Sequence, residues 1–203
     1  MMATTHAFAG LLVAAAASAV TGDAAPLVFA AGLFGGLFPD FDLYAGHRKT
    51  LHFPVYGALA GVLGAGAYLV VGGTLALALA VFLLAAALHA ASDVLGGGLE
   101  LRPWEGTSER AVYDHFNGVW WRPRRWIRYD GAPEDALVGL ALAIPGYLAV
   151  SGALRTLVLA AVVVSVGYAA VRKPMVALAE RLVAATPAPV LAYVPARFVE
   201  DIA

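Results

Sequence analysis

Cysteine is absent from this chain, and charged residues are scarce. Without cysteine there can be no disulfide, no thiolate metal ligand and no cysteine nucleophile. Asp, Glu, Lys and Arg together make up 13% of the 203 residues, roughly half the share in a soluble domain, whereas 61% of the residues are hydrophobic. A soluble fold could not cover its surface with so few charges. The composition therefore predicts an integral membrane protein whose first partner is the lipid bilayer.

Long runs without charge divide the chain into expected membrane helices. The segment from Phe53 to Ser92 contains no Asp, Glu, Lys or Arg and is long enough for two spans of about 20 residues each, with a tight turn at Gly72-Gly73. No Lys or Arg precedes the first apolar run, so we expect a retained helix rather than a cleaved signal peptide. We predict an all-α, polytopic membrane helical bundle. Its six expected transmembrane helices cover residues 6–21, 25–38, 54–71, 74–95, 135–150 and 154–171, and a weaker amphipathic helix covers 174–185.

The six expected spans determine which loops share a side of the membrane. The N-terminus, loop 39–53, loop 96–133 and the C-terminal tail fall on one face, together with every Lys and Arg except Arg155. Positive charge favours the cytoplasmic side of a membrane. We therefore expect a multi-pass protein of the cell membrane with its N-terminus in the cytoplasm. The whole chain, 1–203, is expected to form a single membrane-embedded domain.

The longest polar stretch, 96–133, mixes arginine with tryptophan. One interpretation is a basic, Trp-rich loop that lies against anionic headgroups. Another is a cap over a functional site that contacts the substrate, and the two are compatible. Nucleic-acid-binding proteins also combine basic and aromatic residues. The net charge of −1 and the membrane context argue against that use, so no nucleic-acid partner is expected.

Histidine and aspartate residues recur where the expected helices begin or end. His6 opens the first helix, and Asp40 and Asp42 follow the second. Further along, His47, Arg48 and His52 precede the third helix, while His89 and Asp93 close the fourth with an i, i+4 spacing that puts both on one helical face. The helix count places all of these residues at the same membrane face. Ionisable groups at such positions are costly and indicate a functional site.

These residues could converge on metal ions. Imidazole and carboxylate ligands without thiolate suit Zn²⁺, Mn²⁺ or Fe²⁺. Each residue also has a simpler interpretation: His6 as an interfacial residue, Asp40 and Asp42 as turn caps, and His89 and Asp93 as hydrogen-bond partners of each other or of a neighbouring helix. Their shared membrane face favours the metal site. We expect one or two divalent ions, with zinc as the first choice.

Four ordered motifs resemble the YdjM-like family of membrane-bound predicted metal-dependent hydrolases, also known as the LexA-regulated hydrolase family. They are Met1 to His6, Gly36 to Asp42, His47 to His52 and His89 to Asp93. The second is one residue tighter than the family pattern, and the resemblance covers roughly residues 1–105. The family is distantly similar to the phospholipase C and P1 nuclease fold, although this chain lacks the second His-x-x-x-Glu helix of those zinc enzymes. The resemblance implies these metal ligands: His6, Asp40, His52, His89 and Asp93.

The resemblance implies hydrolysis by metal-activated water, with a phosphoester or phospholipid-like molecule as the expected substrate. In that reaction Asp42 or His47 could move the proton, and Arg48 could neutralise developing oxyanion charge. No Gly-x-Ser-x-Gly motif supports a serine nucleophile. The alternative is a non-enzymatic multi-pass protein with a structural or transported metal. A transporter should place polar groups near the middle of the membrane and often contains repeats, and neither feature is present in the sequence.

Overall fold

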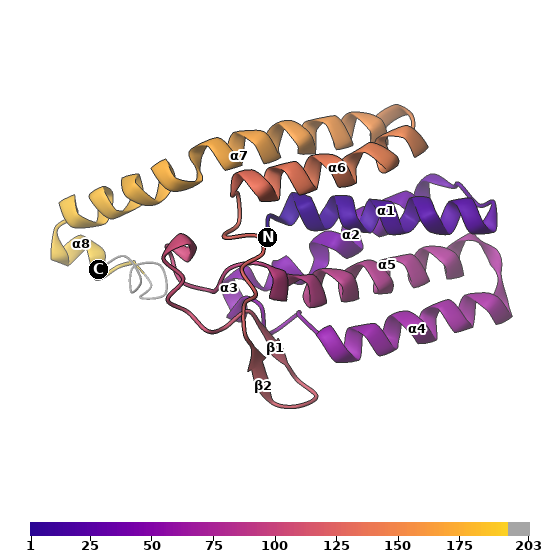
Figure 1. Ribbon diagram of the computed structural model, residues 1–203, viewed down its shortest axis with the longest axis horizontal. Helices are drawn as coiled ribbons and strands as arrows, with labels where there is room; N and C mark the ends of the chain where they lie inside the picture. Colours follow the sequence, from indigo (N-terminus) through magenta and orange to yellow (C-terminus); the bar gives the residue numbers. More distant parts are fainter. Residues whose placement is uncertain (195–203) are drawn as a thin grey trace.

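A computed structural model describes residues 1–194 and shows an elongated bundle of helices (Figure 1). The all-α prediction is confirmed. The last helix among the described residues is the short α8, at Ala188–Leu191. The principal helices are α1 (Ala3–Thr21), α2 (Pro26–Leu37), α4 (Pro54–Val71), α5 (Gly73–Ser92), α6 (Pro133–Ala149) and α7 (Gly152–Ala185).

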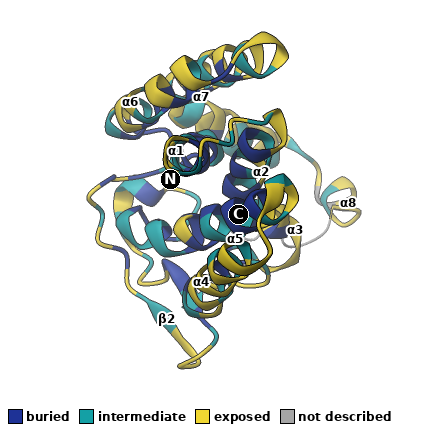
Figure 2. Ribbon diagram, turned by 90° about the vertical axis from the view of Figure 1, so that its right-hand side faces the viewer, coloured by how far each residue is buried: buried dark blue, intermediate teal, exposed yellow. Residues whose placement is uncertain are grey.

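Five segments within the described residues are long and apolar enough to cross a membrane. The remaining predicted span, the fifth in order at 135–150, corresponds to α6, which has 17 residues. At 1.5 Å per residue it is about 26 Å long, slightly less than the ~30 Å hydrocarbon core. The outer faces of α4 and α7 are largely exposed, as Figure 2 shows. Because their exposed residues are mainly apolar, they form a surface that a bilayer would cover. The five segments are Ala3–Thr21, Pro26–Gly46, Pro54–Val71, Gly73–Leu95 and Gly152–Ala185.

Helix α1 is the centre of the bundle, and it packs against α2, α5 and α6. Glycines permit its close approach to α2, because a Cβ atom on Gly10 would overlap the backbone of Gly32 and the reverse is also true. Phe8 and Leu11 of α1 are fully buried in the apolar core that α2, α5, α6 and α7 complete. By contrast, α4 packs mainly on α5 at the edge of the bundle (Figure 1).

The C-terminal part of the chain differs from the prediction in its helices. The expected break after residue 171 is absent, and α7 continues as one helix of 34 residues with Pro174 inside it. A helix of that length spans about 51 Å, so it extends roughly 20 Å beyond a ~30 Å hydrocarbon core. Its continuation carries Arg172, Lys173, Glu180 and Arg181, which are polar enough for that position. Proline removes one backbone hydrogen bond but does not end this helix.

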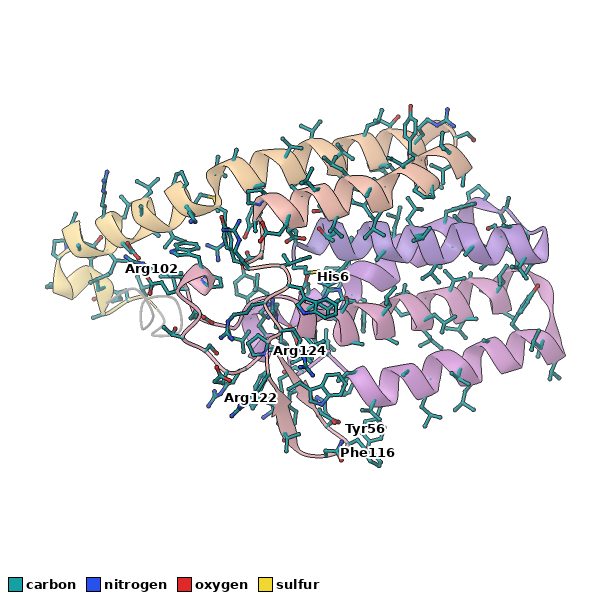
Figure 3. The ribbon with its side chains drawn as sticks, in the orientation of Figure 1. His6, Tyr56, Arg102, Phe116, Arg122 and Arg124 are labelled. Carbon is teal, nitrogen blue, oxygen red and sulfur yellow. The ribbon has the colours of Figure 1, made fainter. Side chains whose placement is uncertain are left out.

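Segment 96–133 is more structured than the loop we expected. It contains a small antiparallel hairpin of β1 (Val112–Asp114) and β2 (Val119–Trp121), in which Val112 pairs with Trp121. A 3₁₀ turn, η3 (Pro103–Glu105), precedes the hairpin, and Arg102 beside it forms an ion pair with Glu180 of α7. Near the tip of the hairpin, the ring centroid of Phe116 lies 6.0 Å from the ring centroid of Tyr56 on α4 (Figure 3).

The site lies at one end of the bundle. The α1–α2, α4–α5 and α6–α7 turns lie together at the opposite end (Figure 1). The N-terminus, the hairpin and the segment between α2 and α4 all lie at the site end. That segment contains η1 (Phe38–Asp42) and α3 (Leu43–Gly46). The fold thus gathers polar segments that are far apart in the sequence.

Candidate metal centre

Two groups of three side chains have ligand atoms close enough together to hold a metal ion. One consists of Asp40, His52 and His89, and the other of His6, His89 and Asp93. Within each group the ligand atoms lie within 4.8 Å of one another, and His89 belongs to both. All five proposed ligands are therefore brought together from η1, the turn before α4, the end of α5 and the start of α1. Four of them are buried, whereas Asp40 is partly exposed.

Four interatomic distances describe the centre. His52 Nε2 lies 3.2 Å from Asp93 Oδ2 and 3.8 Å from Asp40 Oδ1. His89 Nε2 lies 3.4 Å from Asp40 Oδ1 and 3.6 Å from Asp93 Oδ2. Two ligands of a tetrahedral zinc ion, each bonded at about 2.0–2.1 Å, are separated by about 3.3 Å. The spacing of these nitrogen and oxygen atoms is therefore suitable for shared coordination.

Hydrogen bonds on the far side of each imidazole orient the two nitrogens inward. His89 Nδ1 lies 2.6 Å from the Gly36 carbonyl oxygen, which can only accept, so the proton must be on Nδ1. His52 Nδ1 lies 2.9 Å from the Asp42 carboxylate, which fixes its ring in the same way. In the neutral rings, both Nε2 lone pairs then point toward the two carboxylates.

Several atoms at this centre lack a hydrogen bond. His52 Nε2, His89 Nε2 and Asp93 Oδ2 are buried and have no hydrogen-bond partner among the described residues. Burying a polar atom without a partner is costly, so such a cluster requires an explanation. A divalent cation among these atoms would satisfy all three at once. The residues present therefore fit a metal ion.

His6 approaches the second oxygen of Asp93. Its Nε2 atom lies 3.1 Å from Asp93 Oδ1, and its ring stacks on His89 with centroids 3.7 Å apart. Ser92 Oγ contacts the other ring nitrogen, Nδ1, at 3.3 Å. Figure 3 shows His6 at the end of the bundle where the polar loops gather. Asp93 can thus present one oxygen to His6 and the other to His52 and His89.

The Asp42 carboxylate organises the turn that carries His52. It is fully buried and accepts contacts from two imidazoles and three backbone N–H groups, those of Arg48, Lys49 and Leu51, at 2.9–3.3 Å. Burial opposes the protonation of His52, but the interactions with Asp42 and Asp93 together outweigh it and raise the pKa of the His52 imidazole. Protons and a metal ion would therefore compete for this centre.

His47 and Arg48 lie between the centre and an adjoining cavity. The cavity has a volume of about 580 Å³, and both residues line it together with Asp40. His47 is 29% exposed, and its Nδ1 donates to Asp42 Oδ1 at 3.1 Å. Arg48 is buried, donates to the Gly97 carbonyl at 2.8 Å and has its Nε atom 3.5 Å from Asp93 Oδ2. Arg48 also has a positive φ of 58°, which is uncommon for a residue other than glycine.

Sequence reasoning missed the supports of the site. The Gly36 carbonyl that orients His89 carries no side-chain signal. Asp135 of α6 was also missed; its buried carboxylate accepts from the Met2 N–H and from the Thr5 hydroxyl, both at 2.7 Å, and so holds the start of α1. Its place among the first residues of an apolar helix was the available signal. His115, the remaining histidine of the chain, lies outside the centre and contacts the Lys49 carbonyl at 2.6 Å.

Comparison with known proteins adds no assignment, because no protein-family model, no curated protein and no solved structure matches this chain. What the sequence and structure support is a helical membrane protein with buried His/Asp groups that could bind a metal ion.

Proposed function

We propose that this protein is a membrane-bound, metal-dependent hydrolase of the YdjM-like type that cleaves a phosphoester. The observation that carries the proposal is the set of inward-facing, buried atoms without hydrogen bonds in His52, His89 and Asp93, beside a cavity of about 580 Å³. A structural ion would need no adjoining cavity. The partly exposed Asp40 is where the centre opens toward it.

A divalent ion bound at this centre, with zinc as the first choice, would lower the pKa of water toward ~7. His47 is the group best placed to move a proton, since it is partly exposed, lines the cavity and is adjacent to the ligands. Asp42 is surrounded by donors, which suits orientation of His52 better than proton transfer. Arg48 lines the cavity, and its buried guanidinium beside Asp93 adds positive charge near the site of an anionic substrate.

The test is hydrolysis by the purified full-length protein in lipid nanodiscs. Metal-stripped protein should be inactive toward a water-soluble phosphodiester such as bis-p-nitrophenyl phosphate and should regain activity with zinc or manganese. His52→Ala should remain inactive after metal addition, whereas His115→Ala should behave as the wild type because His115 lies outside the centre. Metal binding without turnover of any phosphoester would instead support a structural or transport role.

We also propose that the site faces the cytoplasm. Every Lys and Arg except Arg155 belongs to the segments expected at the site end, and Arg155 lies near the start of α7 at the opposite end (Figure 1). Positive charge close to membrane helices favours the cytoplasmic side.

A further inference from the structure

The cavity beside the metal centre is lined by both polar and apolar side chains. Asp40, His47 and Arg48 line it next to the centre, the apolar side chains of Leu43 and Val164 also line it, and its further charged residues are Glu100, Asp130 and Arg172. Leu43 is 56% exposed and Val164 is 59% exposed, although both are apolar. The cavity therefore reaches a surface that water would solvate poorly and that hydrocarbon chains would cover well.

The position of these residues along α7 gives their depth in the membrane. Counted from Gly152 at the opposite end, Val164 lies about 18 Å along the helix, Tyr168 about 24 Å and Arg172 about 30 Å. For a hydrocarbon core of ~30 Å, Val164 is within the apolar region, and Arg172 is at the headgroup level. One wall of the cavity thus crosses the boundary between hydrocarbon and headgroups.

The same wall is fixed to the rest of the bundle on either side of this boundary. Ser165 Oγ donates to Thr4 Oγ1 at 2.7 Å, which joins α7 to the start of α1, where Thr4 lines the cavity. Nearer the headgroup level, Arg172 forms an ion pair with Asp130 at 2.9 Å, and the Tyr168 hydroxyl donates to the same carboxylate. The cavity is therefore a formed feature between fixed contacts.

From this mixed lining, and from the depths of Val164 and Arg172 along α7, we infer that the cavity binds a glycerophospholipid that enters sideways from the bilayer. Its anionic phosphate lies toward Arg48 and the metal centre, and its acyl chains pass between Leu43 and Val164 into the membrane. A volume of about 580 Å³ is typical of a site for a small ligand, too little to enclose two acyl chains, so the chains must remain in the bilayer. This inference rests on the proposed function for the reaction, but the binding it describes does not require turnover.

The experiment uses full-length protein in vesicles of phosphatidylcholine with a photoreactive phosphatidylglycerol, and peptide mass spectrometry to locate the crosslinks. Crosslinks should concentrate in the peptides that contain Leu43 and Val164. Val164→Trp, which would place a larger side chain in the cavity lining, should reduce crosslinking at Leu43 about tenfold, a loss of ~1.4 kcal/mol in binding. Val163→Trp is the matched control, since Val163 is 70% exposed and does not line the cavity; its crosslinking should be unchanged.

Equal crosslinking in the two variants, or uniform labelling over all lipid-facing helices, would overturn the inference. Repeating the measurement on chelator-stripped protein separates it from the proposed reaction. Crosslinking that depends on Val164 in a protein with no hydrolytic activity would support the lipid site while the hydrolase proposal fails. Hydrolysis of a water-soluble phosphodiester without a difference between the two variants would support the hydrolase and contradict the lipid site.

Discussion

At the scale of single residues, Asp42 is the side chain on which the geometry of the centre most depends. Its two carboxylate oxygens contact two imidazoles and three backbone N–H groups, so both oxygens must be acceptors. Asp42 was predicted from the sequence to be catalytic, but its surroundings are those of a residue that positions His52. The sequence indicated that Asp42 belongs to the site but not which atoms surround its carboxylate.

Replacing Asp42 with asparagine should weaken metal binding about 10–100-fold, the usual effect of losing a partner that orients a ligand. One of the two acceptors becomes an NH₂ group that faces a donor, so the His52 ring loses its orientation. The measurement is competition for zinc with a chelator of known affinity. Asp114→Asn is the control, because Asp114 also accepts several hydrogen bonds but does so in the hairpin. An equal affinity in the two variants would contradict this role for Asp42.

At the scale of elements, the contact of α1 and α2 positions two ligands at once. A Cβ atom on Gly36 would overlap the carbonyl of His6 and lie 2.9 Å from the Cα atom of Ala7. The same glycine supplies the carbonyl that orients His89. Any residue larger than glycine must therefore push α1 away from α2 and disturb His6 and His89 together.

We expect Gly36→Ala to destabilise the protein by about 1–3 kcal/mol through overpacking and to reduce metal retention. Gly66→Ala on the exposed face of α4, where a Cβ atom meets nothing within 4 Å, should be neutral or stabilising by up to about 1 kcal/mol. Thermal unfolding in detergent, followed by circular dichroism, compares the two. Gly36→Ala with wild-type stability and metal content would show that this close packing is not required.

The helices could be predicted where hydropathy determines their boundaries. The elements whose boundaries depend on tertiary contacts could not. A charge-free run bounded by Pro54 and Gly72 defined α4, because hydropathy and turn residues coincide there. The continuation of α7 through Pro174 was not foreseen, since proline usually marks a helix boundary. The hairpin near Asp114 was also missed, because its strands have three residues each and carry almost no periodic signal. The ligands were identifiable as residue types, whereas their backbone supports were not.

At the scale of the whole molecule, the proposed orientation would put the two ends of the bundle on opposite sides of a membrane. The absence of cysteine makes this testable, since any introduced cysteine is the only thiol. Ala24→Cys lies in the α1–α2 turn, and Arg122→Cys replaces an 82% exposed side chain at the site end (Figure 3). In intact cells an impermeant maleimide should label Ala24→Cys, and it should label Arg122→Cys only after permeabilisation. The reverse result would invert the proposed orientation, and labelling of both in intact cells would contradict a spanning bundle.

The metal content of the purified protein tests the central claim most directly. His89 belongs to both ligand groups, so His89→Ala should abolish metal retention, whereas His115→Ala should retain the wild-type amount. The measurement is elemental analysis after purification with zinc and extensive dialysis, on variants that unfold at the same temperature as the wild type. We predict one or two zinc ions per wild-type chain and none in folded His89→Ala. A wild-type protein without bound metal, or equal retention by the two variants, would contradict the account.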